Sequence, residues 1–235
     1  MRSKKQTFPV RGGRLPVLLV ACALAGCNRD APPATATPPH DPRQVTAALI
    51  TARKTGSYRE LEQYIVQKRR SEVVATLIAV DGFLEANRSL GDRVRQVFSQ
   101  AIAESIDQSY FGQNLDIFSP GVQLLDHSVN GAGAEVAYQV NEQLPLRHTQ
   151  LVIEQGEWRY DPGEGYDPAL PRAFEEMARG LKTLQQDLDS GRLPIDRIRS
   201  NPEMLQEEVR MRLSAGLKQL PAAGRAKPGS ERLHP

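Results

Sequence analysis

Between residues 42 and 106 the hydrophobic positions recur every three or four residues, which is the period of an amphipathic α-helix. The first helix is expected to begin at Asp41-Pro42, because aspartate caps free backbone N–H groups and proline has no N–H to leave unpaired there. Further helices are expected over 73–86 and again from residue 94, the last of them capped by Asp92.

The hydrophobic period changes to two beyond residue 121. Val136, Tyr138 and Val140 alternate with polar residues, as on a strand that buries one face. The expected strands cover 122–129, 136–140, 146–154 and 157–160. No helical pattern separates these strands, so they are expected to pair as an antiparallel meander.

A second amphipathic region follows the strands. Asp167-Pro168 and Asn201-Pro202 each predict the start of a helix. Each helix is expected to bury one apolar stripe, made of Phe174, Met177, Leu181, Leu184 and Leu188 on the first and of Leu205, Val209, Leu213, Leu217 and Leu220 on the second. We interpret the two helices as a hairpin packed on the body, with a docking or dimer surface as the alternative.

The predicted fold class is therefore α+β, with N-terminal amphipathic helices packed on a curved antiparallel sheet and a C-terminal helical hairpin after it. The predicted organisation is a signal peptide over 1–26, a Pro/Ala-rich linker over 27–41, an α+β domain over 42–166, a helical extension over 167–220 and a disordered tail over 221–235.

The first 26 residues contain five basic residues and no acid, and end in an apolar run of 12 residues from Leu15 to Gly26. That run is shorter than the ~20 residues a membrane-spanning helix needs, and the layout is typical of a secretory signal peptide. The segment Leu24-Ala25-Gly26-Cys27 resembles the lipobox of bacterial lipoproteins.

The lipobox resemblance implies that Cys27 is lipid-modified with palmitate-like acyl chains and becomes the first residue of the mature chain. Asn28 follows it, where lipoproteins retained in the inner membrane usually have aspartate, so the family rule implies an outer-membrane protein facing the periplasm. An ordinary cleavage site or an uncleaved anchor is the alternative. The other cysteine, Cys22, would leave with the signal peptide.

The end of the predicted sheet resembles a second family. The segment LVIEQGEWRYDP over 151–162 is similar to the strand, glycine turn and tryptophan ending of many lipoproteins with the NTF2-like (cystatin-like) fold. The resemblance implies a conical pocket, with Tyr138 and Trp158 as candidate lining residues. Aromatic residues on strands are also common in protein cores, which is the alternative interpretation.

Charge and motifs narrow the classes of function. Lys and Arg number 30 against 28 Asp and Glu, which argues against a strongly basic nucleic-acid binder. No HExxH, CxxC, P-loop or GxGxxG motif occurs, so no metal or cofactor is expected. Asp126, His127 and His148 are the best candidates for acid–base catalysis, although the adjacent Asp126 and His127 are expected to face opposite sides of a strand. Histidines on a half-exposed sheet face are the alternative.

The sequence therefore predicts a non-catalytic, membrane-anchored module of the cell envelope that binds a ligand or a protein. The membrane contact is through Cys27, and an envelope protein is a possible partner of residues 168–220. Two alternatives stay open: an NTF2-like hydrolase or isomerase with a pocket histidine and carboxylate, and a purely structural partner of an envelope assembly. No nucleic-acid partner is expected, and the small-molecule ligand is not identified.

Replacing Cys27 with serine removes the thiol that accepts the lipid. Cys27→Ser is expected to give a released chain or an unprocessed precursor, and membrane fractionation with intact-mass measurement checks this. A variant that still fractionates as the mature, membrane-bound chain would contradict the lipobox interpretation.

Overall fold

The computed structural model describes residues 41–112, 115–163 and 167–220. The predicted signal peptide, Cys27, the linker up to residue 40 and the tail over 221–235 lie outside the described residues. The described residues fall within one unit of the chain, which begins at Pro38.

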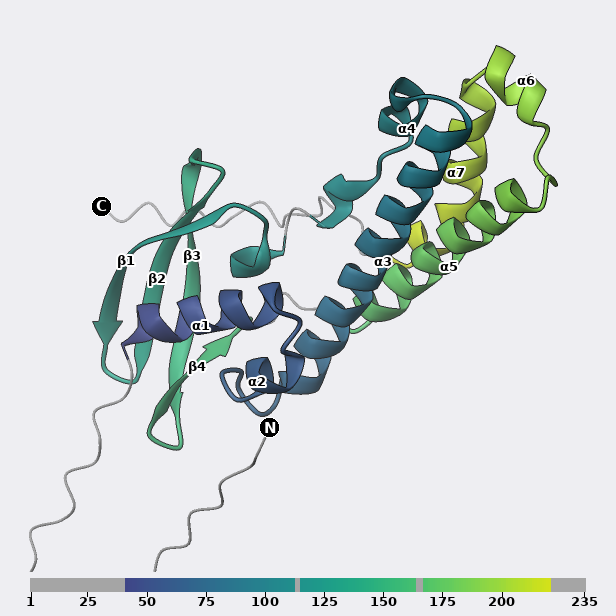
Figure 1. The fold of residues 1–235 in the computed structure, drawn as a ribbon. Helices are drawn as coiled ribbons and strands as arrows, with labels where there is room; N and C mark the ends of the chain where they lie inside the picture. The colour runs from purple at the N-terminus through teal and green to yellow at the C-terminus, as the bar shows by residue number, and fades with distance from the viewer. Residues whose placement is uncertain (1–40, 113–114, 164–166, 221–235) are drawn as a thin grey trace, which may run out of the picture. The chain divides into compact units, whose positions relative to one another are not determined.

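The fold is α+β, as the sequence predicts (Figure 1). Its helices and strands are α1 (Pro42–Lys54), α2 (Tyr58–Glu62), α3 (Arg70–Val97), α4 (Gln100–Ser105), the 3-10 helices η1 (Ser109–Gly112) and η2 (Asp116–Phe118), β1 (Val122–Asn130), β2 (Gly133–Val140), β3 (Gln143–Glu154), β4 (Glu157–Asp161), α5 (Leu170–Asp189), α6 (Ile195–Ser200) and α7 (Glu203–Leu217).

Helix α1 begins where the capping signal places it. The Asp41 carboxylate accepts hydrogen bonds from the backbone N–H groups of Arg43 at 2.7 Å and Gln44 at 3.3 Å. These bonds satisfy two donors that have no partner within the helix. The buried face of α1, with Val45 and Leu49, then packs against the sheet.

The four strands form the predicted antiparallel meander in the order β1-β2-β3-β4. Val136, Leu151 and Tyr160 share the inner face, where none of their side chains is exposed to solvent, and contribute to the core under α1. The register of β1 against β2 shifts between Leu124 and His127. A bulge of this kind bends a strand and increases its local twist.

Helix α3 corrects the predicted helix boundaries. The sequence predicts one helix over 73–86 and another capped by Asp92, whereas the structure has one helix of 28 residues through this region. Asp92 does not cap a helix; its carboxylate pairs with Arg95 at 2.6 Å on the same helix. The helix continues because Leu90 and Val94 extend the buried stripe.

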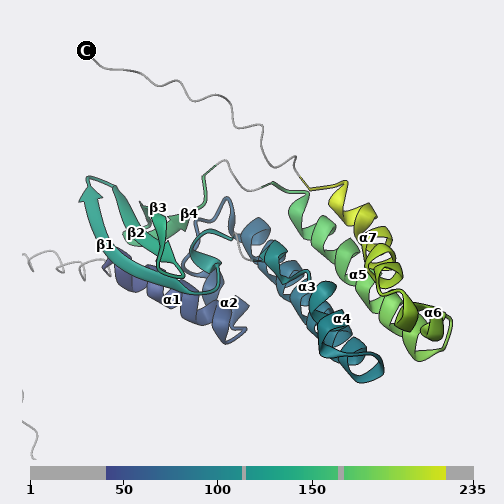
Figure 2. The same cartoon turned by 90° about the horizontal axis from the view of Figure 1, so that it is seen from above.

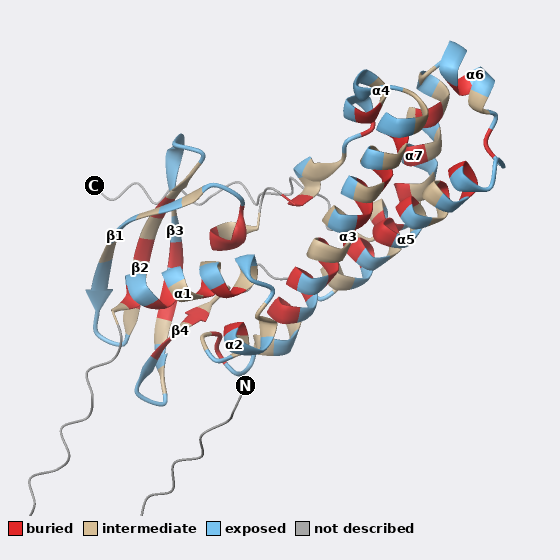
Figure 3. Cartoon of the chain, in the orientation of Figure 1, coloured by how far each residue is buried: buried red, intermediate tan, exposed pale blue. Residues whose placement is uncertain are grey.

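Two hydrophobic cores meet on α3, visible in Figure 3 as two groups of buried residues. Val73 and Leu77, near its start, pack into the core of the sheet. Phe83 and Leu90, further along, pack into a second core with α5 and α7. The polar side chain of Asn87 is also buried here, and its amide donates to Asp107 at 2.6 Å.

The C-terminal helices pack as predicted, with α5 between α3 and α7 (Figure 2). The predicted stripe of α5 is buried along its whole length, and Leu205, Val209 and Leu213 of α7 are buried against it. Helix α5 crosses α7 closely at two glycines. A Cβ added at Gly180 would collide with the carbonyl oxygen of Arg212, and one at Gly216 would lie 2.5 Å from the carbonyl oxygen of Ala173.

The glycine crossing gives a stability prediction with a matched control. Gly180→Ala is expected to lower the free energy of unfolding by ~1–3 kcal/mol, because the helices must separate to admit the methyl group. Gly82→Ala, inside α3 with nothing within 4 Å of its added Cβ, is expected to raise it by ~1 kcal/mol. Denaturant unfolding of both variants measures the two changes. Equal stabilities would contradict the close crossing.

Candidate functional site

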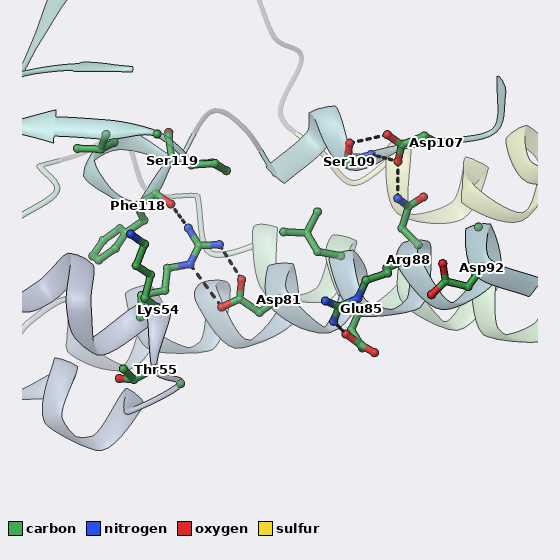
Figure 4. A pocket seen from close by; sticks show the side chains of 18 of the residues that line it. Lys54, Thr55, Asp81, Glu85, Arg88, Asp92, Asp107, Ser109, Phe118 and Ser119 are labelled. Atoms are coloured by element: carbon green, nitrogen blue, oxygen red, sulfur yellow. Dashed lines mark hydrogen bonds and ion pairs between the residues drawn. The ribbon is translucent and has the colours of Figure 1, made fainter. Parts of the chain in front are cut away.

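A groove of about 980 Å³ runs over α3 (Figure 4). Its floor is the polar face of α3 from Asp81 to Arg95. One end is lined by the last turn of α1 and by residues 118–122, which lead into β1. The other end is lined by α4 and the segment around Asp107. The groove is therefore lined both by helices that precede the sheet and by the segment that leads into β1.

A hydrogen-bonded network closes the first end of the groove. The Arg53 guanidinium donates to the two carboxylate oxygens of Asp81, at 2.7 and 3.4 Å, and to the carbonyl oxygen of Phe118. The Tyr58 hydroxyl donates to the same carboxylate at 2.6 Å. The Arg53 side chain is 11% exposed and the Asp81 side chain 29%, so the pair is partly shielded from solvent. It ties α1 and α2 to α3 and to the turn before β1.

Burial raises the pKa of Tyr58 from 10.0 to about 12, and the hydrogen bond to Asp81 adds to the rise. Both effects favour the neutral phenol, because ionisation would place a second negative charge beside the carboxylate.

Asp107 fixes the segment that lines the other end of the groove. Its carboxylate accepts hydrogen bonds from the side chains of Asn87 and Ser109, at 2.6 and 2.7 Å, and from the backbone of Ser109. Burial opposes ionisation of Asp107, but these hydrogen bonds outweigh burial and lower its pKa. A carboxylate with a lowered pKa is a poor general base at neutral pH.

Between these ends α3 presents two exposed ion pairs. Glu85 pairs with Arg88, and Asp92 pairs with Arg95, each three residues apart on the helix. Arg88 and Glu85 are 70% and 60% exposed, and Arg95 and Asp92 about half exposed. Such pairs contribute only a few tenths of a kcal/mol to stability, so their partners can be exchanged at little cost.

Asp116 anchors the segment that lines the groove beside β1. Its carboxylate accepts from the hydroxyl groups of Tyr138, Tyr160 and Thr149, at 2.5, 2.7 and 3.2 Å. These donors lie on β2, β4 and β3, so one carboxylate fixes η2 to three strands. Phe118, which follows in η2, is thereby held where its carbonyl meets Arg53.

The predicted catalytic residues lie apart from the groove. His127 pairs with Val136 in the sheet register, and His148 pairs with Ala137, so the two histidines lie on opposite faces. His127 lies 3.5 Å from Asp41, and His148 lies 3.2 Å from Glu135. Asp126 sits in the bulge of β1, where its carboxylate accepts the backbone N–H of His127.

The two candidate pocket residues are buried in the core of the sheet. Tyr138 is 2% exposed and Trp158 is 5% exposed. Neither lines the groove. Burial raises the pKa of Tyr138, and the hydrogen bond to Asp116 adds to the rise.

The sequence does not single out the groups that build the groove, because its local signals are weak there. Arg53 and Asp81 are 28 positions apart, and no motif links them. Gly91 is the local signal, because a glycine inside a helix lowers its stability and often has a packing or functional reason. In the part of the chain that the structure describes, no three His, Cys, Asp or Glu residues are placed to hold a metal ion.

No family model, curated protein or solved structure matches this chain. Among the described helices, none combines the length and apolar character needed to cross a bilayer.

The raised pKa of Tyr58 predicts how stability changes in alkali. Its contribution is fully present below pH 10.0, and is lost between pH 10 and about 12, because the unfolded state ionises there while the folded state keeps the proton. The free energy of unfolding should therefore fall across this window, and less steeply in Tyr58→Phe. Denaturant unfolding at several pH values tests this. An identical slope in the variant would contradict the raised pKa.

Proposed function

We propose that this chain is a lipid-anchored lipoprotein of the bacterial cell envelope, held on the outer membrane and facing the periplasm. Its folded body is a non-catalytic binding module, and the groove over α3 is its binding surface. The occupant is a segment of a protein partner.

The anchor is supported by the lipobox at Leu24-Ala25-Gly26-Cys27 and by Asn28 after it. One acyl chain binds a membrane marginally, whereas two or more bind stably. The proline-rich composition of the residues up to Asp41 is typical of a spacer between an anchor and a folded body. A groove carried by such a body has access to proteins that share the same membrane.

The open groove is the observation that carries the binding function. Its volume of about 980 Å³ extends along several turns of α3, which suits a chain segment. The acids at its two ends are held by hydrogen bonds: Asp81 by Arg53 and Tyr58, and Asp107 by Asn87. Groups held in this way fix a surface for recognition rather than a proton-transfer site.

We further propose that α1 and the sheet form an NTF2-like domain. The helix packed across one face of an antiparallel meander, and the Trp158 segment in its last strand, support this assignment. Tyr138 and Tyr160 are buried inside this domain and both donate hydrogen bonds to Asp116, which favours the exposed groove over α3 as the binding surface.

A photoreactive amino acid at position 85, in the full lipidated chain in intact cells, tests occupancy of the groove. It is expected to give one discrete cross-linked protein product. The matched position is Met211 on α7, which is 50% exposed and should give none. Gly91→Trp should abolish the product by filling the groove, because an added Cβ there meets nothing within 4 Å. Gly82→Trp, on the same helix but outside the groove lining, should not.

Equal cross-linking from positions 85 and 211, or a product unaffected by Gly91→Trp, would contradict a binding role for the groove. Retention of a small molecule by the purified chain in native mass spectrometry, lost on Gly91→Trp, would instead assign the groove to a small ligand.

A further inference from the structure

We propose that the partner in the groove is a second copy of this chain, paired with the first through antiparallel α3 helices. This inference rests on the proposed function of the groove and names its occupant. The pairing surface is the stripe of Glu85, Arg88, Asp92 and Arg95, called here the α3 stripe.

The α3 stripe occupies one face of the helix, because its members are spaced by three and four residues. Successive residues turn by 100°, which places the stripe opposite Phe83, Leu90 and Val94, the residues that pack into the core with α5. All four stripe residues are exposed. A second helix that enters between the groove walls at residues 118–122 and at α4 can therefore contact the stripe without displacing α5.

The order of charges along the α3 stripe is self-complementary. It runs acid, base, acid, base from Glu85 to Arg95. When two copies lie antiparallel about a twofold axis near residue 90, Glu85 faces the partner's Arg95, and Arg88 faces the partner's Asp92. The symmetry repeats both contacts, which gives four opposite-charge pairs and no like-charge pair. In a parallel arrangement each residue would face its own copy, and every pair would repel.

Gly91 supports a close approach of another chain. Gly180 and Gly216 have a reason within the chain, since a Cβ at either would collide with a neighbouring helix. Gly91 lines the groove beside the stripe, yet nothing lies within 4 Å of its added Cβ. Gly91 therefore leaves room beside the stripe for a neighbouring helix to approach the α3 backbone.

The membrane anchor makes a weak pairing effective. Exposed ion pairs contribute little each, so the dimer is expected to dissociate readily in dilute solution. Anchoring confines the copies to one thin layer and so raises their local concentration above that of the same chain free in solution. Lipidation and self-association then act together.

Charge exchange at one pair tests the proposal. The full lipidated chain in detergent is measured by light scattering over a range of concentrations, which gives the dimer Kd. Glu85→Arg and Arg95→Glu are each expected to raise the Kd at least tenfold, because each places like charges opposite one another. The double variant restores opposite charges and should return the Kd to within about threefold of the original.

Glu207→Arg on α7 is the matched control, because Glu207 forms the same kind of exposed pair, three residues from Arg210. It should leave the Kd unchanged. Failure of the double variant to restore pairing would overturn the proposed register. A chain that stays monomeric at all concentrations would overturn self-association.

The two proposals fail in different ways. If the chain is monomeric and the product from position 85 contains another protein, the groove binds a partner, and only the proposal that this partner is a second copy is wrong. If the chain is monomeric and position 85 gives no product, both proposals fail.

Discussion

The position of α3 constrains the rest of the structure, because this one helix belongs to both hydrophobic cores. Val73 and Leu77 are fixed in the core of the sheet, and Phe83 and Leu90 in the core with α5. Neither core can shift along the helix without opening its own packing, since cores are close-packed. The polar face of α3 is thereby held between two rigid bodies, and the groove forms along it.

Two carboxylates fix the segments that line the groove over α3. The Asp81 carboxylate accepts hydrogen bonds from Arg53 and Tyr58, and so fixes the end of α1 against α3. Asp116 receives three hydroxyl groups from the sheet, and so fixes the neighbouring segment that also meets Arg53. Removing Asp81 would leave the largely buried Arg53 guanidinium without its ionic partner, which costs more than the pair itself contributes. The main effect of the network is therefore to fix the segments that line the groove, rather than to raise the free energy of unfolding.

The sequence was sufficient where one local signal decided the outcome. The cap at Asp41, the alternation around Tyr138 and the apolar stripe from Phe174 to Leu188 all predicted their elements. It failed between the predicted helices of residues 73–106, where Gly91 and Asp92 resemble a break but tertiary packing of Leu90 and Val94 carries the helix through. The groove could not be predicted from the sequence, because it depends on contacts such as that of Arg53 with Asp81, which no hydrophobic period indicates.

The binding role proposed for the groove requires that the groove be occupied when the chain is at its membrane. The most direct test is the reactivity of a thiol introduced at Arg88, whose side chain is 70% exposed in the isolated chain. If Cys27 is lipidated, this cysteine is the only free thiol of the mature chain. Occupancy of the groove predicts slow maleimide labelling at position 88 in intact envelopes and fast labelling after dilution into detergent, with a thiol at Met211 labelled equally in both. Equal labelling at position 88 in both conditions would contradict it.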